Sequence, residues 1–143
     1  MGDKVLLSSF TAWIIAQVSK FFIWRWRKGK LNFRLLVSAG GMPSSHSALV
    51  SALATSVGLW EGFSSTAFAI SLIFALIVMY DAAGVRRAAS MQARILNQIL
   101  EELFRGHPVS EKRLWELLGH TPFEVLVGAL IGVTVSSIFY WLR

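Results

Sequence analysis

The sequence contains no cysteine and few charged residues. Without cysteine, the chain can form neither disulfide bonds nor a thiolate metal site. Only 15% of its 143 residues are charged, whereas 55% are hydrophobic. A soluble domain of this length usually has more charge and fewer apolar side chains. The composition therefore predicts a single membrane-embedded domain over residues 1–143.

Acidic residues are also scarce, with 8 against 14 basic residues and a net charge of +6. In a membrane protein, basic residues gather in loops that face the cytoplasm and anionic lipid. Binding of nucleic acid would require an exposed basic face on a soluble fold, which this apolar composition does not support. We therefore expect the bilayer as a partner, and no nucleic acid.

Three apolar segments approach the length of about 20 residues that a membrane-spanning helix needs, and a fourth is expected to be a span packed inside the bundle. Residues 5–24, 64–80 and 122–142 are strongly apolar, and residues 44–60 are apolar but rich in the small residues that let membrane helices pack closely. We expect an all-α integral membrane bundle of about four transmembrane helices. The first segment has no small-residue cleavage site, so we interpret it as a retained helix and not a signal peptide.

The segment between residues 82 and 121 has a different pattern. Ile95, Ile99 and Leu103 recur at helical spacing with polar residues between them. This pattern predicts an amphipathic helix that lies at the membrane interface or caps the bundle. Gly106 and Pro108 would end this helix, and a short second helix would follow.

The distribution of basic residues predicts the orientation. The connections after the first and third spans are rich in arginine and lysine, whereas the second connection contains only Glu61 as a charged residue. By the positive-inside rule, the two basic connections are cytoplasmic and both termini lie outside. Three polar clusters, at residues 40–46, 80–87 and 119–124, then share the cytoplasmic face, although they are far apart in the sequence. We expect a functional site there.

The first cluster has the features of a helix N-terminus. Gly40 and Gly41 permit a tight backbone, and Ser44 or Ser45 can cap the helix. The free N–H groups and positive dipole end of such a terminus bind anions, phosphate above all. An ordinary helix cap is the alternative, but it gives no role to His46, which can transfer protons.

The other clusters supply charged and nucleophilic groups. Arg86 and Arg87 can clamp phosphate oxygens, or can simply anchor the cytoplasmic loop. His120 and Glu124 stand four residues apart, so the carboxylate can orient an imidazole that acts as nucleophile or base. Alternatively, His120 caps the helix and Glu124 favours its first turn through the dipole.

Two further ionisable residues lie near these clusters. Lys20 lies in the first span, where such groups usually face a partner or a cavity, although it could instead snorkel to the interface beside Trp24. Asp81 is expected to pair with an arginine of its own loop and to organise it. No further carboxylates can be placed beside it, so no metal site is predicted.

Three motifs resemble a known family. They are Gly-Gly-Met-Pro-Ser-Ser-His-Ser at residues 40–47, Met-Tyr-Asp-Ala-Ala-Gly-Val-Arg-Arg at residues 79–87 and Gly-His-Thr-Pro-Phe-Glu at residues 119–124. Together they are similar to the divergent membrane branch of the type 2 phosphatidic acid phosphatase and vanadium haloperoxidase superfamily. In that superfamily a Pro-Ser-Gly-His motif binds phosphate and supplies the histidine that protonates the leaving group. Residues 43–46 match this motif, with Ser45 in place of glycine.

The resemblance also implies the remaining roles. His120 would be the nucleophile and Glu124, in place of aspartate, its orienting carboxylate, while Arg86 or Arg87 would provide the arginine of the last motif. The arginines are separated from His120 by the whole amphipathic segment, and no Arg-Pro pair follows Lys20. We therefore expect a membrane lipid phosphatase that hydrolyses a phosphate monoester or diphosphate through a phosphohistidine, with no cofactor.

Two other functions remain open at this point. The chain could be a non-catalytic protein that binds or transports a lipid head group, or a purely structural subunit. Loss of hydrolysis in His120→Ala would distinguish an enzyme from either. A bundle of this size could also associate into a homo-oligomer.

Overall fold

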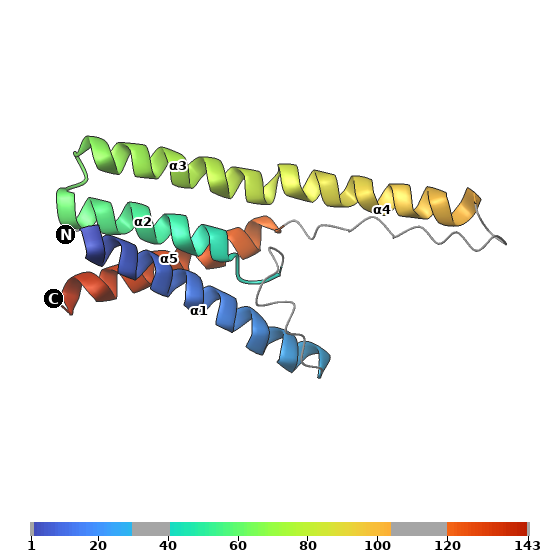
Figure 1. Ribbon diagram of the computed structural model, residues 1–143, viewed down its shortest axis with the longest axis horizontal. Coiled ribbons are helices and arrows are strands. Elements are labelled where there is room, and N and C mark those ends of the chain that lie inside the picture. The colour runs from blue at the N-terminus through green and yellow to red at the C-terminus, as the bar shows by residue number, and fades with distance from the viewer. Residues whose placement is uncertain (1, 30–40, 104–119, 143) are drawn as a thin grey trace.

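The computed structural model describes residues 2–29, 41–103 and 120–142, and every regular element in these ranges is a helix. In chain order the helices are α1 (Gly2–Lys28), α2 (Ser45–Glu61), α3 (Thr66–Ala83), α4 (Val85–Leu103) and α5 (Pro122–Trp141). Figure 1 shows α1, α2, α3 and α5 side by side in a bundle. The predicted all-α fold is confirmed.

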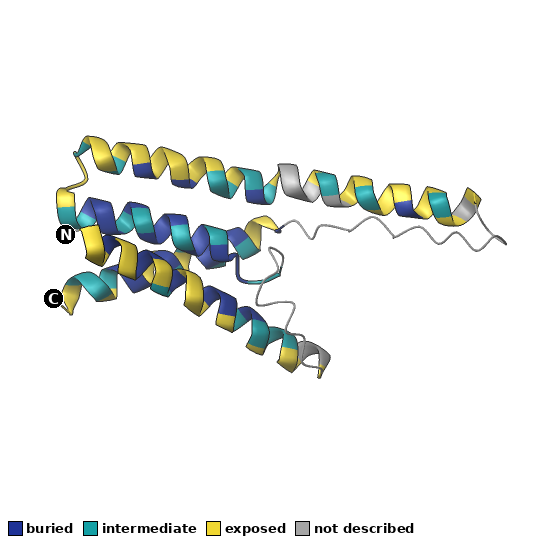
Figure 2. Ribbon diagram, viewed as in Figure 1, coloured by how far each residue is buried: buried dark blue, intermediate teal, exposed yellow. Residues whose placement is uncertain are grey.

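Helix α2 is the centre of the bundle, since it packs against α1, α3 and α5. Most of its buried residues are serine, alanine or glycine. Figure 2 shows this burial on α2 and on the facing sides of α1 and α5, whereas α3 is largely exposed. Apolar side chains exposed on the outside of a bundle are suited to lipid, because the bilayer is itself an apolar solvent.

Contacts between the helices fix their directions. Ser51 Oγ donates to the Ala129 carbonyl at 3.1 Å, and Ser136 Oγ donates to the Ala52 carbonyl at 2.9 Å. Later residues of α2 therefore meet later residues of α5, so the two helices are parallel. Helix α1 is antiparallel to α2, because Ser8 pairs with Ser56 near the end of α2 and Lys20 meets its first residue.

Two glycines allow α5 to approach α2 closely. A Cβ atom at Gly128 would collide with the Ser44 carbonyl, and one at Gly132 would collide with Ser51 Oγ and the Ala48 carbonyl. The four-residue spacing puts both glycines on one face of α5, as in the close helix pairs of other membrane proteins. This contact fixes the position of α5 along the axis of α2.

The predicted spans agree with the structure in part. Helices α1 (over Gly2–Trp26), α3 and α5 are long and apolar enough to cross a membrane. Helix α2 has 17 residues, and its crossing stays a prediction. Helix α3 continues three residues beyond residue 80, and Gly84 alone separates it from α4. The loop expected around Asp81 is therefore wrong, since alanines and arginines favour continued helix there.

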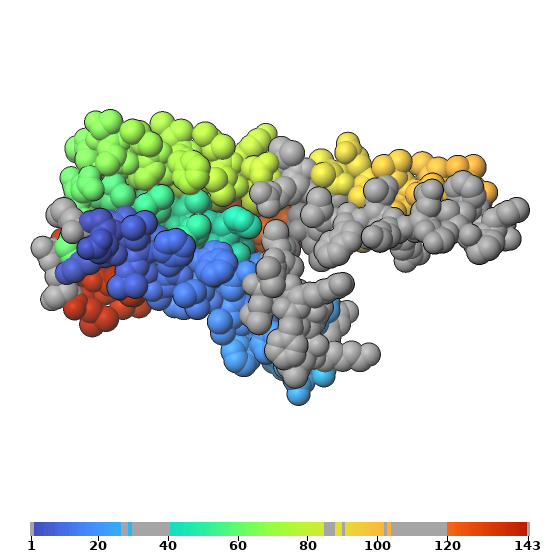
Figure 3. Space-filling view, viewed as in Figure 1, coloured from blue at the N-terminus to red at the C-terminus, as the bar shows by residue number. Residues whose placement is uncertain are grey.

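Helix α4 is the predicted amphipathic helix. Met91, Ile95, Ile99 and Leu103 are exposed on it, whereas Asn97 is buried. Figures 1 and 3 show α4 extending past the bundle beyond α3 instead of covering the end of the bundle, so the capping alternative is wrong. Its position at a membrane interface stays a prediction. The short second helix expected after it lies outside the described residues.

Candidate functional site

The candidate site lies at the end of the bundle where α2 and α5 begin. The Ser44 N–H donates to the Glu124 carbonyl at 3.1 Å, which joins the two helix starts. The His120 N–H donates to the Ala82 carbonyl at 3.2 Å, which joins them to the end of α3. Lys20 reaches the same end from α1. Residues from all three predicted clusters and the first span therefore meet at one end of the molecule.

Both helix starts are capped by side chains. Ser44 is the N-cap of α2 and accepts a hydrogen bond from the Ser47 N–H at 3.3 Å. Thr121 is the N-cap of α5, and its hydroxyl accepts from the Glu124 N–H at 3.3 Å, while the Glu124 carboxylate accepts from the Thr121 N–H at 2.9 Å. Because the helices are parallel and adjacent, their positive dipole ends converge, which favours an anion between them.

Lys20 is buried at this end, with 2% of its surface exposed. Its Nζ donates to Ser45 Oγ at 3.2 Å, and it lies within electrostatic range of the Glu124 carboxylate. A buried ammonium is costly unless it is hydrogen-bonded and balanced by negative charge. Snorkelling to the interface beside Trp24 is therefore wrong, because Lys20 points into the bundle instead.

His120 is buried beside Glu124. The imidazole is almost fully covered, with 1% of the residue exposed, and its Nδ1 lies 3.4 Å from Glu124 Oε2. A carboxylate next to Nδ1 favours the tautomer with the proton on that nitrogen, which leaves Nε2 as the nucleophilic atom. The alternative that His120 itself caps α5 is wrong, since Thr121 takes that position.

Of the remaining predicted residues, some are placed by the structure and others lie outside the part of the chain that it describes. His46 is the second residue of α2, so its backbone lies at the same end of the bundle as His120. The residue is half-buried. Gly41 has a φ of +92°, a conformation that favours glycine. Asp81 is half-buried in the last turn of α3, and its pairing with an arginine stays a prediction. Three predictions fall outside what is described: the backbone at Gly40, and the side chains of Arg86 and Arg87 in the first turn of α4.

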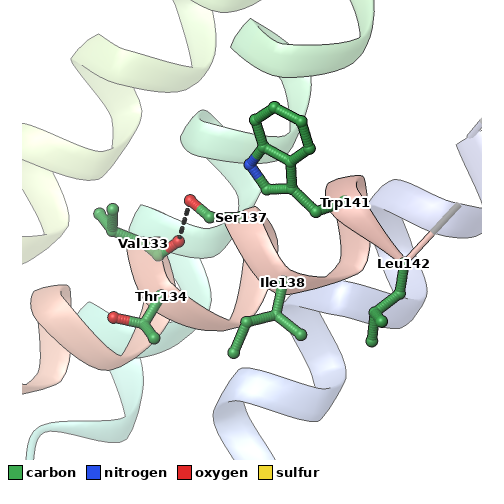
Figure 4. A pocket seen from close by; sticks show the side chains of 6 residues that line it. All are labelled: Val133, Thr134, Ser137, Ile138, Trp141 and Leu142. Carbon is green, nitrogen blue, oxygen red and sulfur yellow. Dashed lines mark hydrogen bonds between the residues drawn. The ribbon is translucent and has the colours of Figure 1, made fainter.

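A surface groove near the other end of α5 is separate from this site. Figure 4 shows it, with the hydroxyl of Ser137 donating to the Val133 carbonyl at 2.8 Å. Its lining side chains come from the last turns of α5 and from the residue that follows it, and they include no ionisable group. They are Val133, Thr134, Ser137, Ile138, Trp141 and Leu142.

Sequence reasoning missed three contributors to the site. Thr121 was missed, although with the predicted Glu124 it forms the Thr-x-x-Glu pattern of a capping box, which was available in the sequence. Gly128 begins a Gly-x-x-x-Gly spacing that signals close packing of membrane helices. The Ala82 carbonyl carries no sequence signal, because any residue at that position offers the same backbone acceptor.

Comparisons with known proteins agree with this architecture. The model of the divergent PAP2 family matches residues 1–135. The uncharacterized membrane protein YuiD of Bacillus subtilis (strain 168) is 44% identical over 144 residues, which cover 93% of this chain and 91% of that protein. No solved structure matches the chain. The resemblance found in the motifs is confirmed, and the chain is a membrane protein that belongs to the divergent PAP2 family.

Proposed function

We propose that the protein hydrolyses a phosphate monoester or diphosphate of a membrane lipid through a phosphohistidine intermediate. The observation that carries this proposal is the contact of 3.4 Å between Nδ1 of the buried His120 and Oε2 of the partly buried Glu124, at the end of the bundle where two helix N-termini converge. A nucleophile oriented by a carboxylate beside a positive anion site is the arrangement that phosphoryl transfer requires.

The positive groups of the site bind the phosphoryl oxygens in this proposal. Lys20 and the first amides of α2, from Ser45 onward, supply positive charge at one end of the bundle, whereas the Ser44 N–H is bonded to the Glu124 carbonyl. Arg86 or Arg87 is expected to add a bidentate contact. Charge spreads over these oxygens in the transition state, and a buried site strengthens its stabilisation.

The two histidines divide the chemistry. His120 Nε2 attacks phosphorus, and the bond from phosphorus to the leaving oxygen breaks as the bond from nitrogen to phosphorus forms. His46 gives its proton to the leaving oxygen. A water molecule then gives a proton to His46 and attacks phosphorus, which releases phosphate and restores His120. We expect this reaction at the cytoplasmic face, where the basic connections are predicted to lie.

One observation favours a second candidate, a protein that binds a lipid head group without hydrolysing it. Only 1% of His120 is exposed, so a phosphorus atom can reach Nε2 only if the site opens. Binding alone would need Lys20 and the helix ends, and would not need His120 as a nucleophile.

Phosphate release by the purified protein in detergent distinguishes the two candidates. A panel of lipid monophosphates and diphosphates is supplied, with and without chelator. We expect release by the wild type, loss of release in His120→Ala, and a fall of roughly 10²–10⁴-fold in His46→Ala. An acid-labile phosphoryl group should be trapped on the wild type and be absent from His120→Ala.

Circular dichroism and gel filtration serve to show that each variant is folded. If folded wild type releases phosphate from no member of the panel, the enzyme proposal is overturned. If that protein still binds a lipid phosphate, and His120→Ala binds it equally well, the head-group binder is the better description.

A further inference from the structure

A buried hydrogen bond joins α1 to α2 inside the candidate site. Lys20 Nζ donates to Ser45 Oγ at 3.2 Å, and the exposed fractions of the two residues are 2% and 1%. Ser45 is the first residue of α2, and Ser44 takes the role of N-cap. The Ser45 hydroxyl is therefore not needed to cap the helix, and it is available to hold the ammonium group.

The position of this ammonium group is electrostatically unusual. It lies at the positive end of α2, which is adjacent to the positive end of α5. Like charges repel at such a place, and the repulsion is stronger in a buried site than in water. Glu124 supplies one balancing negative charge within range of Lys20. A phosphate group, with up to two negative charges, would balance the ammonium and both helix ends together.

We propose that Ser45 is a positioning residue that holds the Lys20 ammonium at the start of α2, where it binds the phosphate of a lipid. The identity of this ligand rests on the proposed function, whereas the role of Ser45 is carried by the geometry. Ser45 acts through Lys20. Its hydroxyl sets the affinity for phosphate and takes no part in the breaking or making of bonds.

Binding of a ligand that cannot be hydrolysed tests this role. A short-chain lipid phosphonate is titrated into the protein in detergent by calorimetry. We expect Ser45→Ala to bind it about tenfold more weakly than the wild type, as for the loss of one hydrogen bond to a charged group. Inorganic phosphate, which lacks the alkyl chain, is titrated in parallel and should bind more weakly than the phosphonate.

The fold provides a matched control. Ser8 and Ser56 form another buried hydrogen bond between α1 and α2, at 2.6 Å and near the far end of α2. Ser56→Ala therefore removes a serine hydroxyl from the same helix pair without altering Lys20. It should bind the phosphonate as the wild type does, even if its thermal stability falls as much as that of Ser45→Ala.

A double-mutant cycle separates positioning from general damage. In a Lys20→Met background, Ser45→Ala should cause no further loss of affinity, because the Ser45 hydroxyl acts only through the ammonium group and the Ser45 amide is unchanged by the substitution. Wild-type affinity in Ser45→Ala, a further loss in the Lys20→Met background, or no phosphonate binding by the folded wild type would each overturn the proposal. Equal affinity for inorganic phosphate would overturn its assignment to a lipid.

The failure of the proposed function would look different. A wild type that binds the phosphonate with the expected dependence on Ser45, but releases no phosphate from any lipid, would refute the enzyme and support the role of Ser45. If the wild type hydrolyses lipid phosphates and Ser45→Ala binds the phosphonate with unchanged affinity, the enzyme is supported and the role of Ser45 is refuted.

Discussion

Glu124 takes part in more interactions than any single sequence motif suggests. Its carboxylate accepts a hydrogen bond from the Thr121 N–H, lies 3.4 Å from His120 Nδ1 and is within electrostatic range of Lys20. Its carbonyl accepts from the Ser44 N–H. One residue therefore connects the cap of α5, the start of α2, the buried histidine and the buried lysine.

Two substitutions of Glu124 should separate the capping role from the charge. Glutamine can also close a capping box, so Glu124→Gln should keep the start of α5 but lose the negative charge beside His120. We expect the helical content to stay that of the wild type but thermal stability to fall, because the buried Lys20 ammonium loses its balancing charge. Hydrolysis should be reduced by roughly 10²–10⁴-fold. Full activity of Glu124→Gln would refute the orienting role.

Glu124→Asp is the complementary variant. It keeps the charge, but its side chain is one methylene shorter and cannot span the capping box in the same way. We expect a loss of about 0.5–2 kcal/mol in the free energy of unfolding, as for the loss of a helix cap. A denaturation series in detergent, followed by circular dichroism, measures this loss. Unchanged stability would show that the cap does not depend on the length of this side chain.

For single residues, the sequence predicts the chemical groups better than their contacts. Lys20, His120 and Glu124 were identifiable because ionisable residues are rare within or beside apolar segments. The hydrogen bond from Lys20 to Ser45 could not be identified from the sequence, because it joins residues 25 positions apart through the packing of two helices. Which serine caps α2 was also open, since Ser44 and Ser45 suit that position equally by type.

The element that organises the site is the parallel pair of α2 and α5. Its close approach depends on the absence of side chains at Gly128 and Gly132, which face the backbone of α2. If these helices moved apart or slid, the Ser44 N–H would leave the Glu124 carbonyl and the two helix starts would no longer coincide. Packing along the middle of the bundle therefore controls geometry at its end.

Gly132→Ala tests this dependence. The added methyl group would collide with Ser51 Oγ and the Ala48 carbonyl, so we expect the free energy of unfolding to fall by roughly 1–3 kcal/mol. Gly2→Ala is the control, because a Cβ atom at Gly2 meets nothing within 4 Å. It should leave stability unchanged or raise it by up to about 1 kcal/mol, since alanine favours helix. Equal stabilities of the two variants would contradict the packing argument.

At the element scale, hydropathy located the four bundle helices to within a few residues, because each must present a continuous apolar surface to lipid or to its neighbours. The boundary between α3 and α4 was less predictable. Asp81 and the arginines after it suggested a loop, yet Gly84 is the only residue between the two helices. The composition of a segment shows that it is polar, but it does not show whether the chain stops being helical there.

The whole molecule gathers its chemistry at one end. Helices α1 and α3 finish there, and α2 and α5 begin there. At the other end, Lys4 lies over the ring of Trp60 at 4.9 Å, and Trp60 contacts Tyr140 with ring centroids 5.6 Å apart. Aromatic residues of this kind are enriched where a membrane meets water. Helix α2 extends about 25 Å between the two ends at 1.5 Å per residue, which is close to the thickness of a hydrocarbon core.

This arrangement makes the number of spans and the orientation measurable together. Because the chain has no cysteine, single cysteines can be introduced at exposed positions and labelled in intact cells with a maleimide that does not cross membranes. The positions are Trp26 in α1, Ser64 between α2 and α3, and Leu142 after α5. If α2 crosses the bilayer and the site is cytoplasmic, Ser64→Cys and Leu142→Cys should be labelled at once, and Trp26→Cys only after permeabilisation.

Each other pattern has a distinct meaning. The reverse pattern would keep four spans but move the site to the outer face, against the positive-inside rule. Labelling of Trp26→Cys and Ser64→Cys from the same side would show that α2 does not cross. In that case α2, which follows Ser44 and carries Ser45 and His46, would turn back inside the membrane. Helices α2 and α5 could then not remain parallel and still begin at the same bilayer surface. Because the Ser44 N–H is hydrogen-bonded to the Glu124 carbonyl, the proposed site requires the four-span topology, and evidence against that topology is also evidence against the site.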